Sequence, residues 1–425
     1  MDNQKIILNV ENLNTTFVSD KKEIKIVKNV SFQVKRGKTL AVVGESGCGK
    51  SVTMNSIMRF TGKNAIVKAD SIQYNALHDG KVTEYHLESI TKPNGPEMRA
   101  LRGPDLSMVF QDPMSSLNPV YKVGDQVAEG LLQHNKGMKK AEAREKVLEM
   151  FRKLGIPDPE ERIDCYPHQF SGGMKQRVVI AIAMICNPEL IICDEPTTAL
   201  DVTIQAQIME LLKSLQVNEG KSIILITHNM GLVAEMADEV CVMYMGRVVE
   251  FGSLEDIFDH TSHPYTKALL SSVFSIDDDP DKEIYVLDGE AQSATGTITG
   301  CVFCNRCNQA KDICRRIGED GVSGEKVYRR TGLKLSPYYP AGKMAWFLEN
   351  ISGAKELAEN GELALGTMDS WLVYKLTGGK EFKTDYSNAS RTQLLNIKDL
   401  VWDREMCELF GIPMKALPQI CDSDS

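Results

Sequence analysis

A glycine-rich loop directly after a short apolar run constrains the fold of this chain more than any other feature. The run covers Leu40 to Val43, and the loop consists of Gly44, Glu45, Ser46, Gly47, Cys48, Gly49, Lys50 and Ser51. The glycines let the backbone curl so that N–H groups point at phosphate oxygens, while Lys50 adds a charge and Ser51 can ligate Mg²⁺. A helix beginning near Ser51 would direct its positive end at the same phosphates. The loop therefore predicts a binding site for a nucleoside triphosphate.

Length and charge limit the classes of protein to consider. The 425 residues are enough for two or three domains, and 42% hydrophobic with 25% charged residues is the composition of an ordinary globular protein. The formal net charge is −9. Because binding to nucleic acid needs a surplus of Lys and Arg to neutralise phosphates, we expect no nucleic-acid partner.

The longest apolar stretch, Val178 to Cys186, has nine residues, about half of what a membrane-spanning helix needs. Any membrane role is therefore expected to come through a partner. The start, Met1 to Lys5, has no charged-then-apolar leader, so we expect a cytoplasmic location. In that setting the eleven cysteines point to reduced thiols or metal ligands rather than disulfides.

Short apolar runs predict an α/β core. The early runs Ile6 to Val10 and Ile26 to Val34 alternate in the manner of a half-buried antiparallel sheet. Four later runs are continuously apolar, as expected for parallel strands covered on both faces: Leu106 to Phe110, Leu190 to Cys193, Ile223 to Thr227 and Val240 to Met245. With helical stretches between them, the pattern predicts a nucleotide at the carboxyl ends of the strands.

Two carboxylates follow the apolar run Leu190 to Cys193. This places Asp194 near a metal that bridges the phosphates, and Glu195 where it could polarise an attacking water. Alone, the pair could be a simple strand-end turn. Together with the loop at Gly44, the functional interpretation is preferred.

A second anion site is indicated where Ser171, Gly172 and Gly173 open a long helical run through Met184. Free backbone N–H groups at a helix start can bind an anion. A plain helix cap is the alternative for Ser171. One nucleotide does not need two such sites from one molecule. The order of the motifs along the chain has to decide between an anion site and a plain helix cap.

That order resembles the ATP-binding subunits of ABC transporters, over about residues 5 to 315. The matching motifs are Walker A at Gly44 to Ser51, the Q-loop at Gln111, the signature at Ser171 to Gly173, Walker B at Leu190 to Asp194 with the catalytic Glu195, the D-loop at Ala199 to Asp201, and the switch His228. Met174 and Cys193 depart from the common pattern. The resemblance implies a P-loop NTPase (RecA-like) core with an antiparallel β subdomain and an α-helical signature subdomain.

The resemblance also implies a mechanism and a set of site residues. Two ATPase subunits would face head to tail, each holding ATP and Mg²⁺ between its Walker A loop and the other's signature. Glu195 would be the base, His228 would orient the γ-phosphate and water, and Gln111, with Ser51 and Asp194, would contact Mg²⁺. Lys50 and Asp201 would complete the nucleotide site. Phe17 resembles the aromatic residue that stacks on adenine, with a core phenylalanine as the alternative.

Further stretches resemble the oligopeptide, dipeptide and nickel importers. They are residues 111–119, 166–170 and 197–203, followed by residues 263–270, which resemble that subfamily's C-terminal extension. The implied partners are a second ABC ATPase subunit, identical or different, and two transmembrane permease subunits. An extracytoplasmic binding protein would select the substrate. The implied location is the cytoplasmic face of the cell membrane.

Four cysteines, Cys301, Cys304, Cys307 and Cys314, are separated by gaps of two, two and six residues. Closely spaced thiolates can surround a soft metal centre, with an iron–sulfur cluster, zinc and unliganded thiols as the alternatives. The subfamily often carries a [4Fe–4S] cluster here. The last ligand of that cluster commonly lies further along the chain. Whether Cys304 takes its place is therefore left open.

From about Arg315 the sequence resembles glycerol kinase and related carbohydrate kinases, at residues 330–333, 337–339, 366–372 and 384–392. Tyr338 matches a tyrosine that contacts the polyol. A glycerol-kinase-like activity is the alternative function, but the segment lacks the phosphate hairpin, the catalytic aspartate and the second domain, so we predict that it is inactive. We expect a fused, loosely packed fragment that leaves Trp346, Phe347, Trp371 and Leu372 poorly buried.

The predicted organisation has three parts. Residues 1–260 form the ABC ATPase domain, with a helical subdomain at about 112–180. Residues 261–315 form the extension with the cysteine cluster. Residues 316–425 form an incomplete α/β segment of carbohydrate-kinase (FGGY) type.

Overall fold

The computed structural model describes residues 5–19, 22–78, 80–90, 92–197, 200–271, 287, 300–310, 314, 322–333 and 339–423. Tyr338, residue 198 and residue 199, the first residue of the predicted D-loop, lie outside these ranges. The chain divides into two compact units, a first unit of residues 1–296 and a second unit of residues 297–425.

A six-stranded sheet forms the centre of the first unit, in the order β11-β10-β3-β9-β8-β7. The strands are β3 (Thr39–Val43), β7 (Leu106–Val109), β8 (Leu190–Asp194), β9 (Ser222–Thr227), β10 (Glu239–Tyr244) and β11 (Arg247–Ser253). All neighbours pair in parallel except β11, which runs antiparallel to β10. The parallel strands predicted from continuous apolar runs are confirmed.

Both faces of this sheet are covered by apolar cores. Ile223 and Leu225 belong to one buried cluster, whereas Ile224 and Ile226 belong to the other. Because side chains alternate along a strand, a strand between two cores has no polar face. Cys193 is a buried core residue of this kind, and burial raises the pKa of its thiol to about 12.

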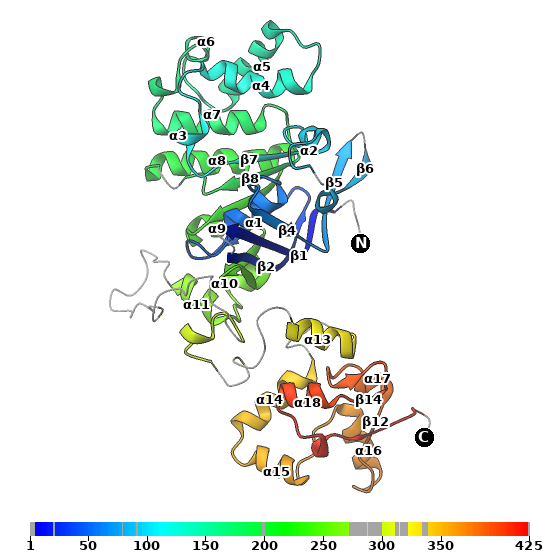
Figure 1. The fold of residues 1–425 in the computed structure, drawn as a ribbon. Coiled ribbons are helices and arrows are strands. Elements are labelled where there is room, and N and C mark those ends of the chain that lie inside the picture. The colour runs from blue at the N-terminus through cyan, green and yellow to red at the C-terminus, as the bar shows by residue number, and fades with distance from the viewer. Residues whose placement is uncertain are drawn as a thin grey trace, which may run out of the picture. The chain divides into compact units, whose positions relative to one another are not determined.

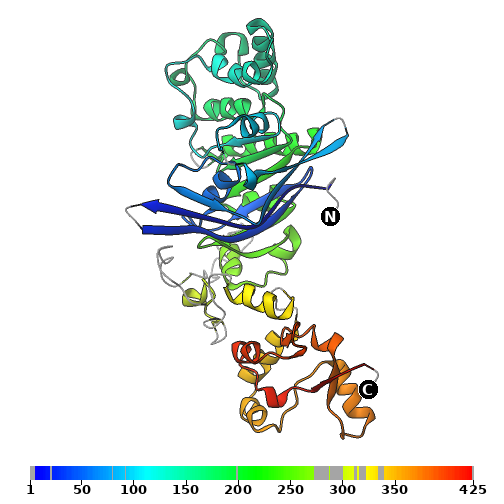
Figure 2. The same cartoon turned by 45° about the vertical axis from the view of Figure 1, so that its right-hand side comes forward.

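An antiparallel sheet of five strands confirms the second predicted sheet. It consists of β1 (Ile6–Ser19), β2 (Lys22–Lys35), β4 (Ala65–Lys68), β5 (Ser71–His78) and β6 (Lys81–His86). Figure 2 shows β1 and β2 as a long hairpin in dark blue. Both strands are longer than predicted, because register shifts near Asn12 and Asn29, with φ of 50° and 51°, interrupt the alternation without ending the pairing.

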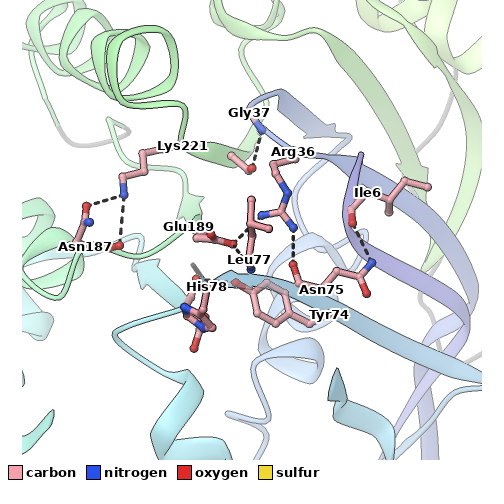
Figure 3. Close-up of polar contacts among 12 residues, drawn as sticks. Ile6, Arg36, Gly37, Tyr74, Asn75, Leu77, His78, Asn187, Glu189 and Lys221 are labelled. Carbon is pink, nitrogen blue, oxygen red and sulfur yellow. Dashed lines mark hydrogen bonds and ion pairs between the residues drawn. The ribbon is translucent and has the colours of Figure 1, made fainter. Parts of the chain in front are cut away.

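A polar network joins the two sheets (Figure 3). One Nη atom of Arg36 lies 2.7 Å from the Glu189 carboxylate, and the other donates to the Asn75 carbonyl oxygen at 2.6 Å. Glu189 also accepts a hydrogen bond from the Leu77 N–H at 3.1 Å. Arg36 follows β2, Glu189 precedes β8, and the other two residues lie in β5. The network therefore fixes the antiparallel sheet to the start of the strand that carries Asp194.

Helices occupy the chain between β7 and β8. They are α3 (Pro113–Ser116), α4 (Val123–His134), α5 (Lys140–Lys153), α6 (Pro159–Arg162) and α7 (Gly172–Met184). Figure 1 shows α4, α5 and α6 grouped beyond α7. Their buried residues, such as Val127, Leu131, Val147 and Phe151, recur at helical spacing and join the apolar cluster of β8 and β9. Over the described ranges, no helix combines the length and the apolar character needed to cross a bilayer.

The second unit has an apolar core of its own. Among its described residues are the helices α13 (Val322–Thr331), α14 (Pro340–Asn350), α15 (Ala354–Asn360), α16 (Met368–Leu376), α17 (Tyr386–Ala389) and α18 (Arg404–Phe410). Two short strand pairs join β12 (Lys383–Asp385) to β15 (Gln419–Cys421) and β13 (Leu395–Asn396) to β14 (Val401–Trp402). Leu348, Ala358, Met406 and Phe410 are among the buried core residues.

The described residues of this fragment share one apolar core, to which α14, α15 and α18 supply side chains. The predicted poor burial of four apolar side chains is confirmed. Trp346, Phe347, Trp371 and Leu372 are 51%, 38%, 53% and 47% exposed. The fragment thus buries one apolar cluster and leaves a second set of apolar side chains in solvent.

Candidate nucleotide-binding site

The glycine-rich loop joins β3 to α1 (Lys50–Ile57). Gly44, Gly47 and Gly49 have φ of 147°, 79° and 102°, a region that residues with a side chain rarely adopt. A Cβ atom on Gly44 would lie 2.1 Å from the Met243 carbonyl oxygen. The backbone of β10 thus approaches the loop so closely that only glycine fits at this position.

Lys50 lies inside the curl of the loop and is 5% exposed. Its Nζ atom donates to the Gly44 carbonyl oxygen at 2.7 Å and to the Glu45 carbonyl oxygen at 3.1 Å. These bonds hold the ammonium group at the loop, where phosphate oxygens are predicted to bind.

Ser51 and Asp194 come together from α1 and the end of β8. The Ser51 hydroxyl donates to Asp194 Oδ1 at 2.9 Å. Burial raises the pKa of Asp194, while the Ser51 hydrogen bond and the charge of Lys50 act in the opposite direction. Two oxygen donors side by side at a buried strand end fit Mg²⁺, which prefers oxygen ligands. Gln111, the third residue predicted for the metal, donates to Glu195, and its contact with Mg²⁺ stays a prediction.

Glu195, directly after β8, is held through its backbone and both carboxylate oxygens. Its N–H donates to the Ile226 carbonyl oxygen at 3.0 Å, and its carboxylate accepts from Gln111 Nε2 at 2.8 Å. The other carboxylate oxygen lies 3.2 Å from His228 Nδ1. Because a carboxylate only accepts, the proton in this contact sits on Nδ1. Glu195 has φ of 46°, the kind of strained conformation that clusters at functional sites.

Ser171 to Gly173 of the predicted signature and Asp201 of the predicted D-loop form a second cluster, at the starts of two helices. The Ser171 hydroxyl accepts from the Met174 N–H at 3.4 Å and begins α7, and Asp201 accepts from the Ile204 N–H at 3.0 Å and begins α8 (Val202–Glu219). A Cβ atom on Gly173 would lie 2.6 Å from Ile204 Cγ2, which brings the two helix starts together. The helix cap foreseen for Ser171 is present.

Phe17 lies in β1, opposite Ile24 of β2 and Ala65 of β4, and is partly buried. It does not belong to the apolar clusters found in the first unit's described residues. Its stacking on adenine stays a prediction.

The cysteine cluster is partly described. The Cys301 N–H donates to the Cys314 carbonyl oxygen at 2.6 Å, and the Cys304 N–H donates to the Cys301 carbonyl oxygen at 2.9 Å. Burial raises the pKa of Cys301 and of Cys307, and neighbouring thiols of the cluster raise both further. Within the described ranges, no group of three or more His, Cys, Asp or Glu side chains has the arrangement of a metal site. The described residues therefore do not support the predicted iron–sulfur cluster.

Comparison with known proteins gives three family matches along the chain. The ABC transporter family matches residues 27–198, and the C-terminal region of oligopeptide/dipeptide transporters matches residues 249–314. The N-terminal domain of the FGGY family of carbohydrate kinases matches residues 287–425. This last match begins earlier than the kinase-like segment predicted from sequence.

The chain is 48% identical over 312 residues to the dipeptide transport ATP-binding protein DppD of Bacillus subtilis (strain 168). The aligned residues cover 73% of this chain and 89% of that protein. This chain belongs to the ABC transporter ATP-binding proteins. The DppD protein of Haemophilus influenzae is 47% identical, over 73% of this chain and 90% of that protein. The DppD protein of Lactococcus lactis subsp. cremoris is 46% identical, over 66% of this chain and 77% of that protein. As an ABC protein of this kind, the chain is an ATPase.

Two supports of the glycine-rich loop were not predicted from sequence. The Gly246 N–H donates to the Cys48 carbonyl oxygen, and the Glu45 N–H donates to the Tyr265 hydroxyl, both at 2.8 Å. No local pattern marks Gly246. Tyr265 falls in residues 263–270, whose resemblance to the C-terminal extension gave it no role.

Proposed function

We propose that this chain hydrolyses ATP to drive the import of dipeptides or oligopeptides. The observation that supports this most strongly is Glu195, held between Gln111 and His228 beside the Ser51–Asp194 pair. Relatives named for dipeptide transport favour peptides over nickel as the cargo.

Each residue has a defined part in the proposed reaction. The loop N–H groups and Lys50 bind the phosphates of ATP. Ser51 and Asp194 would hold Mg²⁺, which when bound neutralises phosphate charge. Glu195 accepts a proton from the attacking water, and His228 keeps that carboxylate in place through Nδ1. Gln111, which donates to the same carboxylate, links this site to the start of the helical region.

The second cluster supports a dimer as the working form. Ser171, Gly172 and Gly173 begin a helix of 13 residues, whose N-terminus attracts anions. We propose that this turn and Asp201 complete the ATP site of a second ABC ATPase subunit, identical or different. Two permease subunits would receive the motion at the cytoplasmic face of the membrane, and an extracytoplasmic binding protein would select the peptide.

The replacement of Lys50 by alanine tests this function. ATP hydrolysis should fall by at least about 100-fold, because one preorganised charge at the phosphates is lost. Lys221→Ala is the matched control, because Lys221 is also buried and its Nζ atom donates to Asn187 Oδ1 at 2.6 Å and to the Asn187 carbonyl oxygen at 3.3 Å (Figure 3). This control should keep its ATPase activity. Neither the wild type nor Lys50→Ala should phosphorylate glycerol, and turnover of glycerol would favour the kinase alternative.

Binding of a [4Fe–4S] cluster by Cys301, Cys304, Cys307 and Cys314 stays a prediction. Iron and sulfide analysis after anaerobic purification tests it, with zinc measured in the same sample. If the cluster forms, Cys301→Ser should lose the iron, whereas Cys186→Ser, outside the cluster, should retain it. The prediction would be contradicted if the wild type contained neither iron nor zinc and the four thiols of this cluster could all be titrated.

A further inference from the structure

Tyr265 reaches the phosphate-binding loop from the region that follows the catalytic core. It lies in α11 (Pro264–Ser271) and is fully buried. Its hydroxyl accepts from the Glu45 N–H at 2.8 Å. The ring packs on Tyr244, with centroids 4.7 Å apart and planes inclined by 59°. A buried hydroxyl is therefore aimed at one backbone N–H of the loop.

The segment directly before α11 is anchored to β11. The Glu250 carboxylate accepts from the backbone N–H groups of Ser262 and His263, at 2.7 and 3.1 Å, and from the Thr261 hydroxyl at 3.0 Å. His263 Nδ1 in turn accepts from the Tyr265 N–H at 3.1 Å. Burial lowers the pKa of His263, which keeps Nδ1 available as an acceptor. These bonds fix the segment from which the Tyr265 side chain extends.

The peptide unit that Tyr265 contacts is also the one that holds Lys50. The N–H of Glu45 and the carbonyl of Gly44 belong to one planar peptide group. Tyr265 binds its N–H side, and Lys50 Nζ binds its oxygen at 2.7 Å. A rotation of this peptide would break both contacts at once, so the Tyr265 hydroxyl and the position of the Lys50 ammonium are linked.

We propose that Tyr265 is a positioning residue for ATP binding, which presets Lys50 by fixing the peptide between Gly44 and Glu45. This inference rests on the proposed function. Tyr265 lies within residues 249–314, which match the C-terminal region of oligopeptide/dipeptide transporters. The match to the ABC transporter family covers residues 27–198. Tyr265 lies outside that match, and the proposal makes it part of the nucleotide site.

Tyr265→Phe tests the inference, because it keeps the ring and removes the hydroxyl. The affinity for ATP should weaken roughly three- to tenfold, the worth of one hydrogen bond. The KM for ATP should rise by a similar factor with kcat nearly unchanged, since the loop contacts phosphates in the ground state and the transition state alike. Equilibrium nucleotide binding and steady-state kinetics measure the two effects.

Tyr74→Phe is the matched control for the loss of a buried hydroxyl. Tyr74 is also fully buried, but it lies in β5 and does not contact the loop through its hydroxyl, which donates to the Asp105 carbonyl oxygen at 3.2 Å. Both variants should lose a similar amount of thermal stability. Only Tyr265→Phe should change the affinity for ATP. His263→Ala, which removes the acceptor of the Tyr265 N–H, should weaken ATP binding in the same direction.

The outcomes separate the inference from the function on which it rests. If the wild type binds ATP and Tyr265→Phe binds it equally well, with only the melting temperature lowered, Tyr265 is a packing residue and the inference is overturned. If the wild type neither binds nor hydrolyses ATP, the proposed function fails and takes the inference with it.

Discussion

Replacing Glu195 by glutamine is expected to lower steady-state ATP hydrolysis by about 100- to 1000-fold while ATP still binds. The amide has nearly the same shape as the carboxylate but cannot accept a proton from the attacking water. Its oxygen can still accept from Gln111 Nε2, which lies 2.8 Å from the carboxylate. Because Lys50 and Ser51 are untouched, the phosphates keep their binding groups. Hydrolysis is measured by phosphate release and binding by equilibrium titration.

Under the proposed mechanism, Glu195→Gln should also accumulate as an ATP-bound dimer, which light scattering after size exclusion with Mg-ATP would detect. Glu189→Gln is the matched control. Glu189 lies at the other end of β8, and its carboxylate is held by Arg36 and by the Leu77 N–H. That variant should lose stability but keep hydrolysis. Wild-type rates in Glu195→Gln would refute its role as the base.

The parallel core could be predicted from sequence because its signals are local. Each of β3, β8, β9 and β10 contains a short, continuously apolar run, and such runs require cover on both faces. The positions of four site residues follow from those strands, because the loop that leads to Lys50 and Ser51 follows β3, and Asp194 and Glu195 lie at the end of β8. Their convergence is a property of the parallel sheet.

Contacts between distant segments could not be predicted in this way. Tyr265 meets Glu45 across 220 residues of chain, and nothing in the sequence around either residue encodes the other. The lengths of β1 and β2 were also missed, because bulges at Asn12 and Asn29 interrupt the alternation that marks a strand.

The second unit shows a different limit of sequence reasoning. A fragment that lacks the sheet of a complete kinase domain would be expected to leave its apolar residues without partners. Met406 and Phe410 of α18 nevertheless pack with Leu348 of α14 and Ala358 of α15. The burial of these side chains depends on which helices the fragment retains and on how those helices pack. The length of the match to the kinase family does not reveal it.

Replacing Gly44 by alanine is expected to have the largest effect on the folded loop. Its φ of 147° strains any residue with a side chain, and the added Cβ would lie 2.1 Å from the Met243 carbonyl oxygen. Because that atom belongs to the backbone of β10, the strand itself would have to move. We expect a loss of about 3 kcal/mol or more in the free energy of unfolding of the first unit, with ATP binding lost as the loop opens.

Gly47→Ala separates steric conflict from backbone strain within the same loop. Gly47 has φ of 79°, but apart from its chain neighbours no atom lies within 4 Å of its would-be Cβ, so the substitution should cost about 1 kcal/mol. All three tryptophans, Trp346, Trp371 and Trp402, belong to the second unit. Tryptophan fluorescence therefore follows that unit as an internal reference, while circular dichroism reports both. Equal stability of the two variants would show that β10 does not press on Gly44, and the close approach of strand and loop would have to be abandoned.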